Sequence, residues 1–183
     1  MSGLRFRAAA IVPLAVGALL GFIGGYFAAG GGRPAAPGPT AASDSSGGGR
    51  LAELSRSLEK DPQNPKLLTG LGDAYYDRQD WDRAIEMYQK ARRKAASDPN
   101  LLSDLGAAYR NRGEFKLAIS LFTKAREADP DHWQSLLNLV LINAFDTRNA
   151  AAAQRHLDEL KRRYPDIPDL DRIQQQISSL KAS

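Results

Sequence analysis

Side chains that commonly carry out chemistry are few in this chain and are not arranged for catalysis. The sequence has two histidines, His132 and His156, whose separation does not match a zinc-binding helix motif. It contains no cysteine, which excludes thiol catalysis, disulfides, thiolate metal sites and haem attachment through cysteine. No glycine-rich phosphate loop and no nucleophile elbow is present. We therefore predict no active site, no metal and no cofactor, and we expect both histidines to be solvated or to pack in ordinary ways.

The charge balance does not indicate a nucleic-acid partner. The net charge is +4, and the dense basic runs are Arg92-Arg93-Lys94 and Lys161-Arg162-Arg163. Both lie where helices are predicted to end, and positive charge there complements the helix dipole. No face that combines basic and aromatic residues supports nucleic-acid binding. We therefore predict no nucleic-acid partner.

The sequence contains an internal repeat with a spacing of 34 residues, and this repeat predicts the helices of the fold. The repeat aligns LLTGLGDAYYDRQDWDRAIEMYQKA with LLSDLGAAYRNRGEFKLAISLFTKA. The recurring residues are Pro65, Gly72, Tyr75, Ala84, Tyr88 and Ala91, and then Pro99, Gly106, Tyr109, Ala118, Phe122 and Ala125. Apolar residues in each half of the unit recur at three- and four-residue steps, as at Leu68, Leu71 and Tyr75. This periodicity predicts two amphipathic helices per unit.

A 34-residue unit with this pattern resembles the tetratricopeptide repeat (TPR), a pair of antiparallel helices. The resemblance implies an all-α fold, a right-handed superhelix of about three repeats with a capping helix, because one hairpin cannot bury its apolar face alone. The residues expected to pack inside it are Leu71, Gly72, Tyr75, Ala84, Tyr88, Ala91, Leu105, Gly106, Tyr109, Ala118, Phe122, Ala125 and Pro130. A mid-helix glycine costs about 1 kcal/mol relative to alanine. We expect Gly72 to offset this cost by letting the two helix backbones approach each other at Ala84.

Helix-start signals divide this part of the chain into segments. Asn64-Pro65 and Asp98-Pro99 each provide an N-cap side chain followed by proline at the first helical position. The predicted segments are a leading helix at 50–64, a first repeat at 65–98, a second at 99–132, a degenerate third at 133–166 and a capping helix at 167–183.

The N-terminal part predicts a membrane anchor. Residues 8–29 carry no charge and are long enough to cross a bilayer as a signal anchor. The basic residues precede this span, so residues 1–7 are expected in the cytoplasm and the repeats in the periplasm or outside a bacterial cell. A stripe of small residues, Gly17, Gly21 and Gly25, favours self-association of the span. The alternative is a signal peptide cleaved near Ala28-Ala29-Gly30. Residues 30–49, rich in Gly, Pro and Ser, are predicted to be a flexible linker.

The resemblance also implies that the first helix of each repeat lines a concave groove that binds a peptide or protein. The candidate groove residues are Thr69, Asp73, Tyr76, Asp77, Ser103, Asp104, Ala107, Arg110, Asn111, Gln134, Leu137, Asn138, Leu141 and Phe145. We expect an acidic, polar groove at the first repeat and an apolar one at the third, with Asn111 and Asn138 bonding the backbone of the peptide.

One class of TPR groove is not predicted. TPR proteins that grip a C-terminal carboxylate use a clamp of lysine, asparagine and arginine. The corresponding places here hold Thr69, Asp73, Asp104, Gln134 and Asn138. None of these residues carries a positive charge, and two would repel a carboxylate. The carboxylate clamp is therefore absent.

The leading functional hypothesis is a membrane-tethered interaction scaffold in the inner membrane without catalytic activity. The segment LAELSRSLEKDPQNPKLLTGLGDAYY also resembles the TPR part of cytochrome c biogenesis factors, which implies a maturation factor that presents apocytochrome. A further alternative is a structural subunit of an envelope-assembly or secretion complex that oligomerises through the glycine-striped span.

Overall fold

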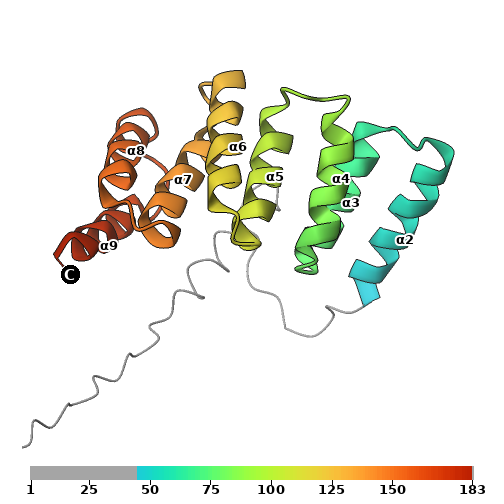
Figure 1. The fold of residues 1–183 in the computed structure, drawn as a ribbon, viewed down its shortest axis with the longest axis horizontal. Helices are drawn as coiled ribbons and strands as arrows, with labels where there is room; N and C mark the ends of the chain where they lie inside the picture. Colours follow the sequence, from blue (N-terminus) through green and yellow to red (C-terminus); the bar gives the residue numbers. More distant parts are fainter. Residues whose placement is uncertain (1–44, 183) are drawn as a thin grey trace, which may run out of the picture. The chain divides into compact units, whose positions relative to one another are not determined.

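The computed structural model describes residues 45–182, with the side chains of residues 48–180. The elements are α2 (Ser45–Lys60), α3 (Pro65–Asp77), α4 (Trp81–Arg92), α5 (Pro99–Asn111), α6 (Phe115–Ala128), α7 (Trp133–Leu141), the π-helix η1 (Ile142–Asp146), α8 (Ala150–Arg163) and α9 (Leu170–Ala182). No strand occurs in this range. Each helix packs against the next one along the chain (Figure 1). The all-α prediction is confirmed for these residues.

The expected N-terminal segments fall mostly outside the described residues. These segments are the span at residues 8–29 with Gly17, Gly21 and Gly25, and the predicted linker as far as residue 44. Between residues 45 and 182, no helix has both the length and the apolar character needed to cross a bilayer. Helix α2 begins at Ser45, which is earlier than the boundary expected at residue 50.

The helix starts follow from capping side chains, as the sequence predicts. The Asn64 side-chain oxygen accepts hydrogen bonds from the backbone N–H groups of Lys66 and Leu67. Asp98 caps α5 in the same way, and Pro65 and Pro99 occupy the first helical positions. These caps set the register of the first helix in both complete repeats.

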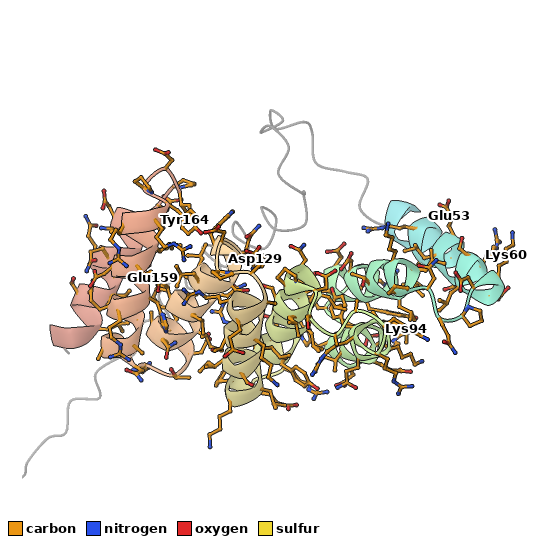
Figure 2. All side chains as sticks on the ribbon, turned by 90° about the horizontal axis from the view of Figure 1, so that it is seen from above. Glu53, Lys60, Lys94, Asp129, Glu159 and Tyr164 are labelled. Carbon is orange, nitrogen blue, oxygen red and sulfur yellow. The ribbon has the colours of Figure 1, made fainter. Side chains whose placement is uncertain are left out.

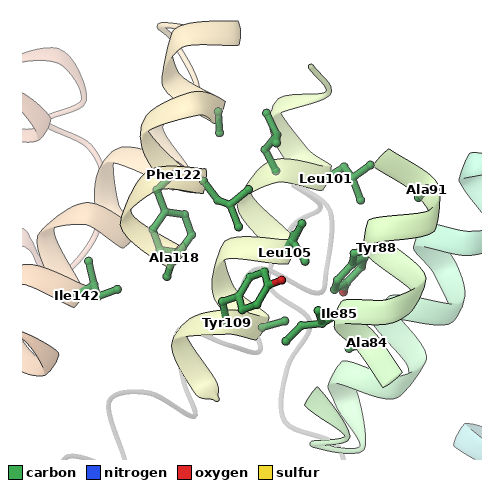
Figure 3. Close-up of a cluster of buried hydrophobic side chains, with 14 of the residues drawn as sticks. Ala84, Ile85, Tyr88, Ala91, Leu101, Leu105, Tyr109, Ala118, Phe122 and Ile142 are labelled. Carbon is green, nitrogen blue, oxygen red and sulfur yellow. The ribbon is translucent and has the colours of Figure 1, made fainter. Parts of the chain in front are cut away.

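The core is shared by the two complete repeats and the start of the third (Figure 3). Its buried side chains come from α3, α4, α5, α6, α7 and η1: Leu68, Ala84, Ile85, Tyr88, Ala91, Leu101, Leu102, Leu105, Ala108, Tyr109, Ala118, Leu121, Phe122, Ala125, Leu139 and Ile142. Most of the predicted packing positions are among them. Pro130 is a predicted packing position that the structure leaves exposed, and its carbonyl accepts a hydrogen bond from Arg163.

The structure gives Gly72 a nearer neighbour than the Ala84 expected from the sequence. The atoms nearest to the place of a Gly72 Cβ belong to the ring of Tyr88, and Cδ1 of that ring would lie 2.5 Å from it. Gly106 has the same relation to Phe122, with the ring carbon Cε1 at 2.7 Å. Each glycine therefore makes room for an aromatic ring from the second helix of its own hairpin.

The third repeat departs from the other two at the end of its first helix. Helix α7 passes into the π-helix η1, where the Asn143 side chain donates a hydrogen bond to the Leu139 carbonyl. The Thr147 N–H then bonds the Ile142 carbonyl, five residues back. This region holds Val140 and Asn143 in place of the glycine and tyrosine of the complete repeats.

Flanking helices cover both ends of the repeat array. The Leu54 side chain of α2 lies against Gly70, and Leu58 packs on the core. At the other end, α9 packs against α8 and buries Leu170, Ile173 and Ile177. The predicted leading and capping helices thus close off apolar surfaces that a terminal repeat would leave open.

Candidate partner-binding face

The predicted partner-binding residues lie on α3, α5, α7 and η1, and we call the surface that they form the first-helix face. Helix α5 contacts both α3 and α7. The predicted members are Thr69, Asp73, Tyr76, Asp77, Ser103, Asp104, Ala107, Arg110, Asn111, Gln134, Leu137, Asn138, Leu141 and Phe145. The packing of α5 against both neighbours makes this one continuous face, but its members differ strongly in exposure.

Tyr76 joins the first and second repeats on this face. The Asn111 side-chain amide donates a hydrogen bond of 2.7 Å to the Tyr76 hydroxyl oxygen. The Tyr76 ring also meets Trp81 edge to face, with ring centroids 5.0 Å apart. Burial raises the pKa of Tyr76 above its ordinary value, so the hydroxyl remains neutral and can still donate its own proton. Asn111 is thus already bonded, but Tyr76 keeps a donor for a ligand.

Two carboxyl groups, Asp73 and Asp104, lie between the first and second repeats. The Tyr88 hydroxyl donates a hydrogen bond of 2.9 Å to Asp73 Oδ1. Burial raises the pKa of Asp73, and the Tyr88 hydrogen bond opposes this shift. Burial raises the pKa of Asp104 to about 7, and the negative charges of Asp73 and Asp98 act in the same direction. The charge of one carboxyl group therefore affects the pKa of the other.

The third-repeat end of the face is more closed than the sequence predicts. Leu141 is 1% exposed and belongs to the interior, and Leu137 is also buried. Asn138 is buried and donates a long hydrogen bond of 3.4 Å to the Ser103 hydroxyl. Among the predicted apolar contacts at this end, Phe145 remains partly exposed. The exposed apolar surface at the third repeat is thus smaller than expected, because Leu137 and Leu141 are buried and α7 packs on α5.

Arg110 is not available as a free cation on this face. Its Nε donates a hydrogen bond of 2.5 Å to Asp146 Oδ2, which joins α5 to η1. The Arg110 side chain is 11% exposed, and that of Asp146 is 22% exposed. At the first repeat, Asp77 forms a longer ion pair with Arg50 of α2. The repeat pattern does not predict the role of Asp146, because the π-helical turn that brings it to Arg110 has no signature in that pattern.

Neither histidine is fully exposed to solvent: His132 is buried and His156 is partly buried. The Nδ1 atom of His132 accepts a hydrogen bond from the Ser135 N–H at the start of α7, and Nε2 lies 3.1 Å from Asn100 Oδ1 on α5. Burial lowers the pKa of His132, and it also lowers the pKa of His156. No cluster of metal-ligating residues occurs in the part of the chain that the structure describes. His132 thus caps a helix and joins two repeats.

A second polar junction lies away from the first-helix face. Arg163, at the end of α8, pairs with Asp131 and Glu159 and donates to the Pro130 carbonyl. The Tyr164 hydroxyl donates to the Asp131 carbonyl, and its side chain lies beside the turn that follows α6 (Figure 2). This junction fixes the turn between the second and third repeats. The basic run at 161–163 therefore helps to hold the fold together.

Comparison with known families identifies the architecture. Two family models, both described as tetratricopeptide repeat, match residues 63–131 and residues 103–169. Together they span every hairpin from α3 to α8. The chain belongs to the tetratricopeptide repeat family. The comparison with curated proteins finds no match.

Solved TPR structures share the fold at low sequence identity. A TPR protein from Parabacteroides merdae matches with a TM-score of 0.65 and 18% identity, over 72% of this chain and 52% of that one. The first TPR domain of Spaghetti (RPAP3), bound to the HSP90 peptide SRMEEVD, matches with a TM-score of 0.61 and 20% identity, over 66% and 98%. The TPR2B domain of yeast Sti1, in complex with an Hsp70 peptide, matches with a TM-score of 0.54 and 19% identity, over 73% and 97%. These likenesses concern the fold.

Proposed function

We propose that this protein is a scaffold without catalytic activity that binds a peptide segment of a partner protein on the first-helix face. TPR domains are protein-interaction modules, and two of the similar structures hold chaperone peptides. The observation that carries the proposal is the set of polar groups on this face. Asp104 has no hydrogen-bond partner among the described residues, and Tyr76 retains a free donor. Groups of this kind bind a peptide by direct hydrogen bonds.

The chemistry of the face disfavours the peptide class bound by the Spaghetti domain. The charged side chains of the peptide SRMEEVD are mostly acidic. Here Asp73 and Asp104 stand on the face, and Arg110 is held by Asp146. An acidic peptide would meet like charge in a partly desolvated place, where repulsion is stronger than in water.

The proposal is tested by crosslinking in intact cells. A photoreactive amino acid replaces Asp77, which is exposed on the first-helix face, or Leu117, which is exposed on α6. Discrete crosslinked species are expected from position 77 and not from position 117. The charge reversal Asp77→Lys should abolish copurification of the trapped partner, whereas Glu86→Lys on α4 should leave it unchanged. Identical crosslinking from both positions, or full retention of the partner by Asp77→Lys, would contradict the proposal.

We also propose that residues 8–29 anchor the protein in the inner membrane of a bacterium, with the repeats outside the cytoplasm. The uncharged span and the basic residues before it support this arrangement. Carbonate extraction should leave the full chain in the membrane fraction, and deletion of residues 8–29 should release it. A C-terminal reporter that is active in the cytosol would contradict the orientation.

A further inference from the structure

Asp104 is a partly buried carboxyl group on the first-helix face. It lies on α5, and its carboxyl group is surrounded closely by protein atoms, although the residue as a whole stays partly exposed. No described residue forms a hydrogen bond or an ion pair with this carboxyl group. A carboxylate in such a place has no protein partner and only partial contact with water, so a free charge there is costly. The Asp104 carboxylate can thus accept hydrogen bonds that no described residue donates.

The charges around Asp104 are unbalanced. The charges that act on it are those of Asp73 on α3 and Asp98 at the start of α5, and both are negative. Two arginines of the first two repeats are paired with other carboxylates, because Arg110 bonds Asp146 and Arg50 pairs with Asp77, and the charge of Arg50 also acts on Asp73. The potential at Asp104 is therefore negative, and a ligand with a positive charge would offset it.

Aromatic groups adjoin the same place. The Tyr88 hydroxyl bonds Asp73. Burial raises the pKa of Tyr76 and of Tyr88, and the charge of Asp104 acts in the same direction on both. The Tyr76 side chain is partly exposed on the first-helix face, and the ring of Tyr88 is buried beneath it. A long basic side chain suits these surroundings, because its alkyl stem packs on aromatic surface while its charged head reaches a carboxylate.

We propose that the first-helix face binds a lysine or arginine side chain of the partner peptide between Asp73 and Asp104. This inference rests on the proposed peptide-binding function and names the chemistry of the ligand. Asp104 accepts the hydrogen bonds of the basic group, and Asp73 contributes a second negative charge while it remains bonded to Tyr88. A bare metal ion is disfavoured, because no cluster of three or more metal-ligating side chains lies here or elsewhere in residues 48–180.

The experiment selects peptide ligands from a random library, so the partner protein need not be identified first. The full chain, purified in mild detergent, is panned at pH 8 against a phage library of random nine-residue peptides. A synthetic peptide of residues 30–49, which contains Arg33, is assayed beside it as the intramolecular alternative. The variant is Asp104→Asn, which removes the charge at nearly constant volume. The control is Glu127→Gln, an exposed carboxyl group on α6.

We expect selected peptides to share lysine or arginine at one position. Replacing that residue by norleucine should weaken binding at least about tenfold. Asp104→Asn should lose the basic preference, and Glu127→Gln should keep it. Because the preference of the unmodified chain is itself informative, the test does not depend on the folding of the variant.

The remaining outcomes overturn the inference in distinguishable ways. The inference would be wrong if the selected peptides showed no preference for a basic residue, or if Asp104→Asn kept that preference. Either result would leave the proposed function intact. Selection of no peptide at all would count against both. A third outcome is that the library yields no enriched peptide but the peptide of residues 30–49 binds and needs Arg33 to do so. That result would show that a segment of this chain itself occupies the face.

Discussion

The ring of Tyr88 lies against the backbone of Gly72, so that a Cβ on Gly72 would come within 2.5 Å of the ring carbon Cδ1. The same ring carries the hydroxyl that bonds Asp73, the residue next to Gly72. One aromatic side chain from α4 thus fills the hairpin core and reaches a carboxyl group of the first-helix face. Packing and the candidate site are therefore coupled in the first repeat.

Gly72→Ala is expected to destabilise the protein by about 1–3 kcal/mol, because the buried ring of Tyr88 cannot move aside without disturbing the core. The matched control is Gly70→Ala in the same helix, where the nearest atom is Leu54 Cδ2 at 3.4 Å. This control should be neutral or stabilising by up to about 1 kcal/mol, because alanine is the better helix former. Urea unfolding followed by circular dichroism measures both. Equal stability of the two variants would show that the ring does not require glycine.

Tyr88→Phe removes the hydrogen bond to Asp73 and leaves the ring in place. We expect a loss of about 1 kcal/mol, the usual net value of one hydrogen bond. Phe122, which stands at the same position of the second repeat, shows that the ring fits beside glycine without a hydroxyl group. Since the hydrogen bond lowers the pKa of Asp73, the variant should also raise that pKa further. NMR titration of the Asp73 carboxyl group measures the change, and an unchanged pKa would contradict the predicted bond.

Asp104→Asn should stabilise the protein at pH 8 and change little at pH 4. The pKa of Asp104 is about 7 in the folded chain and 3.8 ordinarily, so the native state holds a proton that the unfolded chain releases. The free energy of unfolding of the unmodified chain must therefore fall as the pH rises between these values. Asparagine does not titrate and avoids this loss. The gain at pH 8 has an upper limit of about 4 kcal/mol, since one pKa unit corresponds to about 1.4 kcal/mol.

Unfolding midpoints of both proteins between pH 4 and pH 8 test this expectation. Other groups also titrate in this range, and the difference between the two proteins removes their contribution. His132, for example, has a lowered pKa, so its effect is to reduce stability as the pH falls below about 6.5. A difference that is independent of pH would show that Asp104 titrates normally.

Asp146→Asn should destabilise the protein by about 1–3 kcal/mol, because Arg110 then remains largely buried without its counter-charge. Amide hydrogen exchange should accelerate mainly in residues 142–149, where η1 and the following turn depend on this contact. The control is Asp82→Asn, which breaks the exposed pair with Arg112 and should change stability by less than about 0.5 kcal/mol. Equal effects of the two substitutions would show that burial does not strengthen the Arg110 pair.

The candidate site is less predictable from the sequence than the fold. The expected face members Asp73, Tyr76 and Asp104 do lie on helices that contact each other. The helical period sets the face of its own helix that each residue occupies, and the stacking of the repeats brings α3 and α5 together. Their bonding partners could not be predicted, since Tyr88, Asn111 and Asp146 belong to other helices of the array. Leu141 follows the same periodicity and is nevertheless buried.

The sequence by itself determined the all-α repeat architecture, because the 34-residue period, the capping residues Asn64 and Asp98 and the apolar periodicity are local properties of the chain. Only the tertiary structure decided which ring each glycine accommodates and which charges are paired. Those relations depend on distances between helices that are far apart along the chain. Asp104 shows the difference most clearly: in the sequence it is one of many acidic residues, and in the folded chain it is a desolvated carboxyl group without a cation.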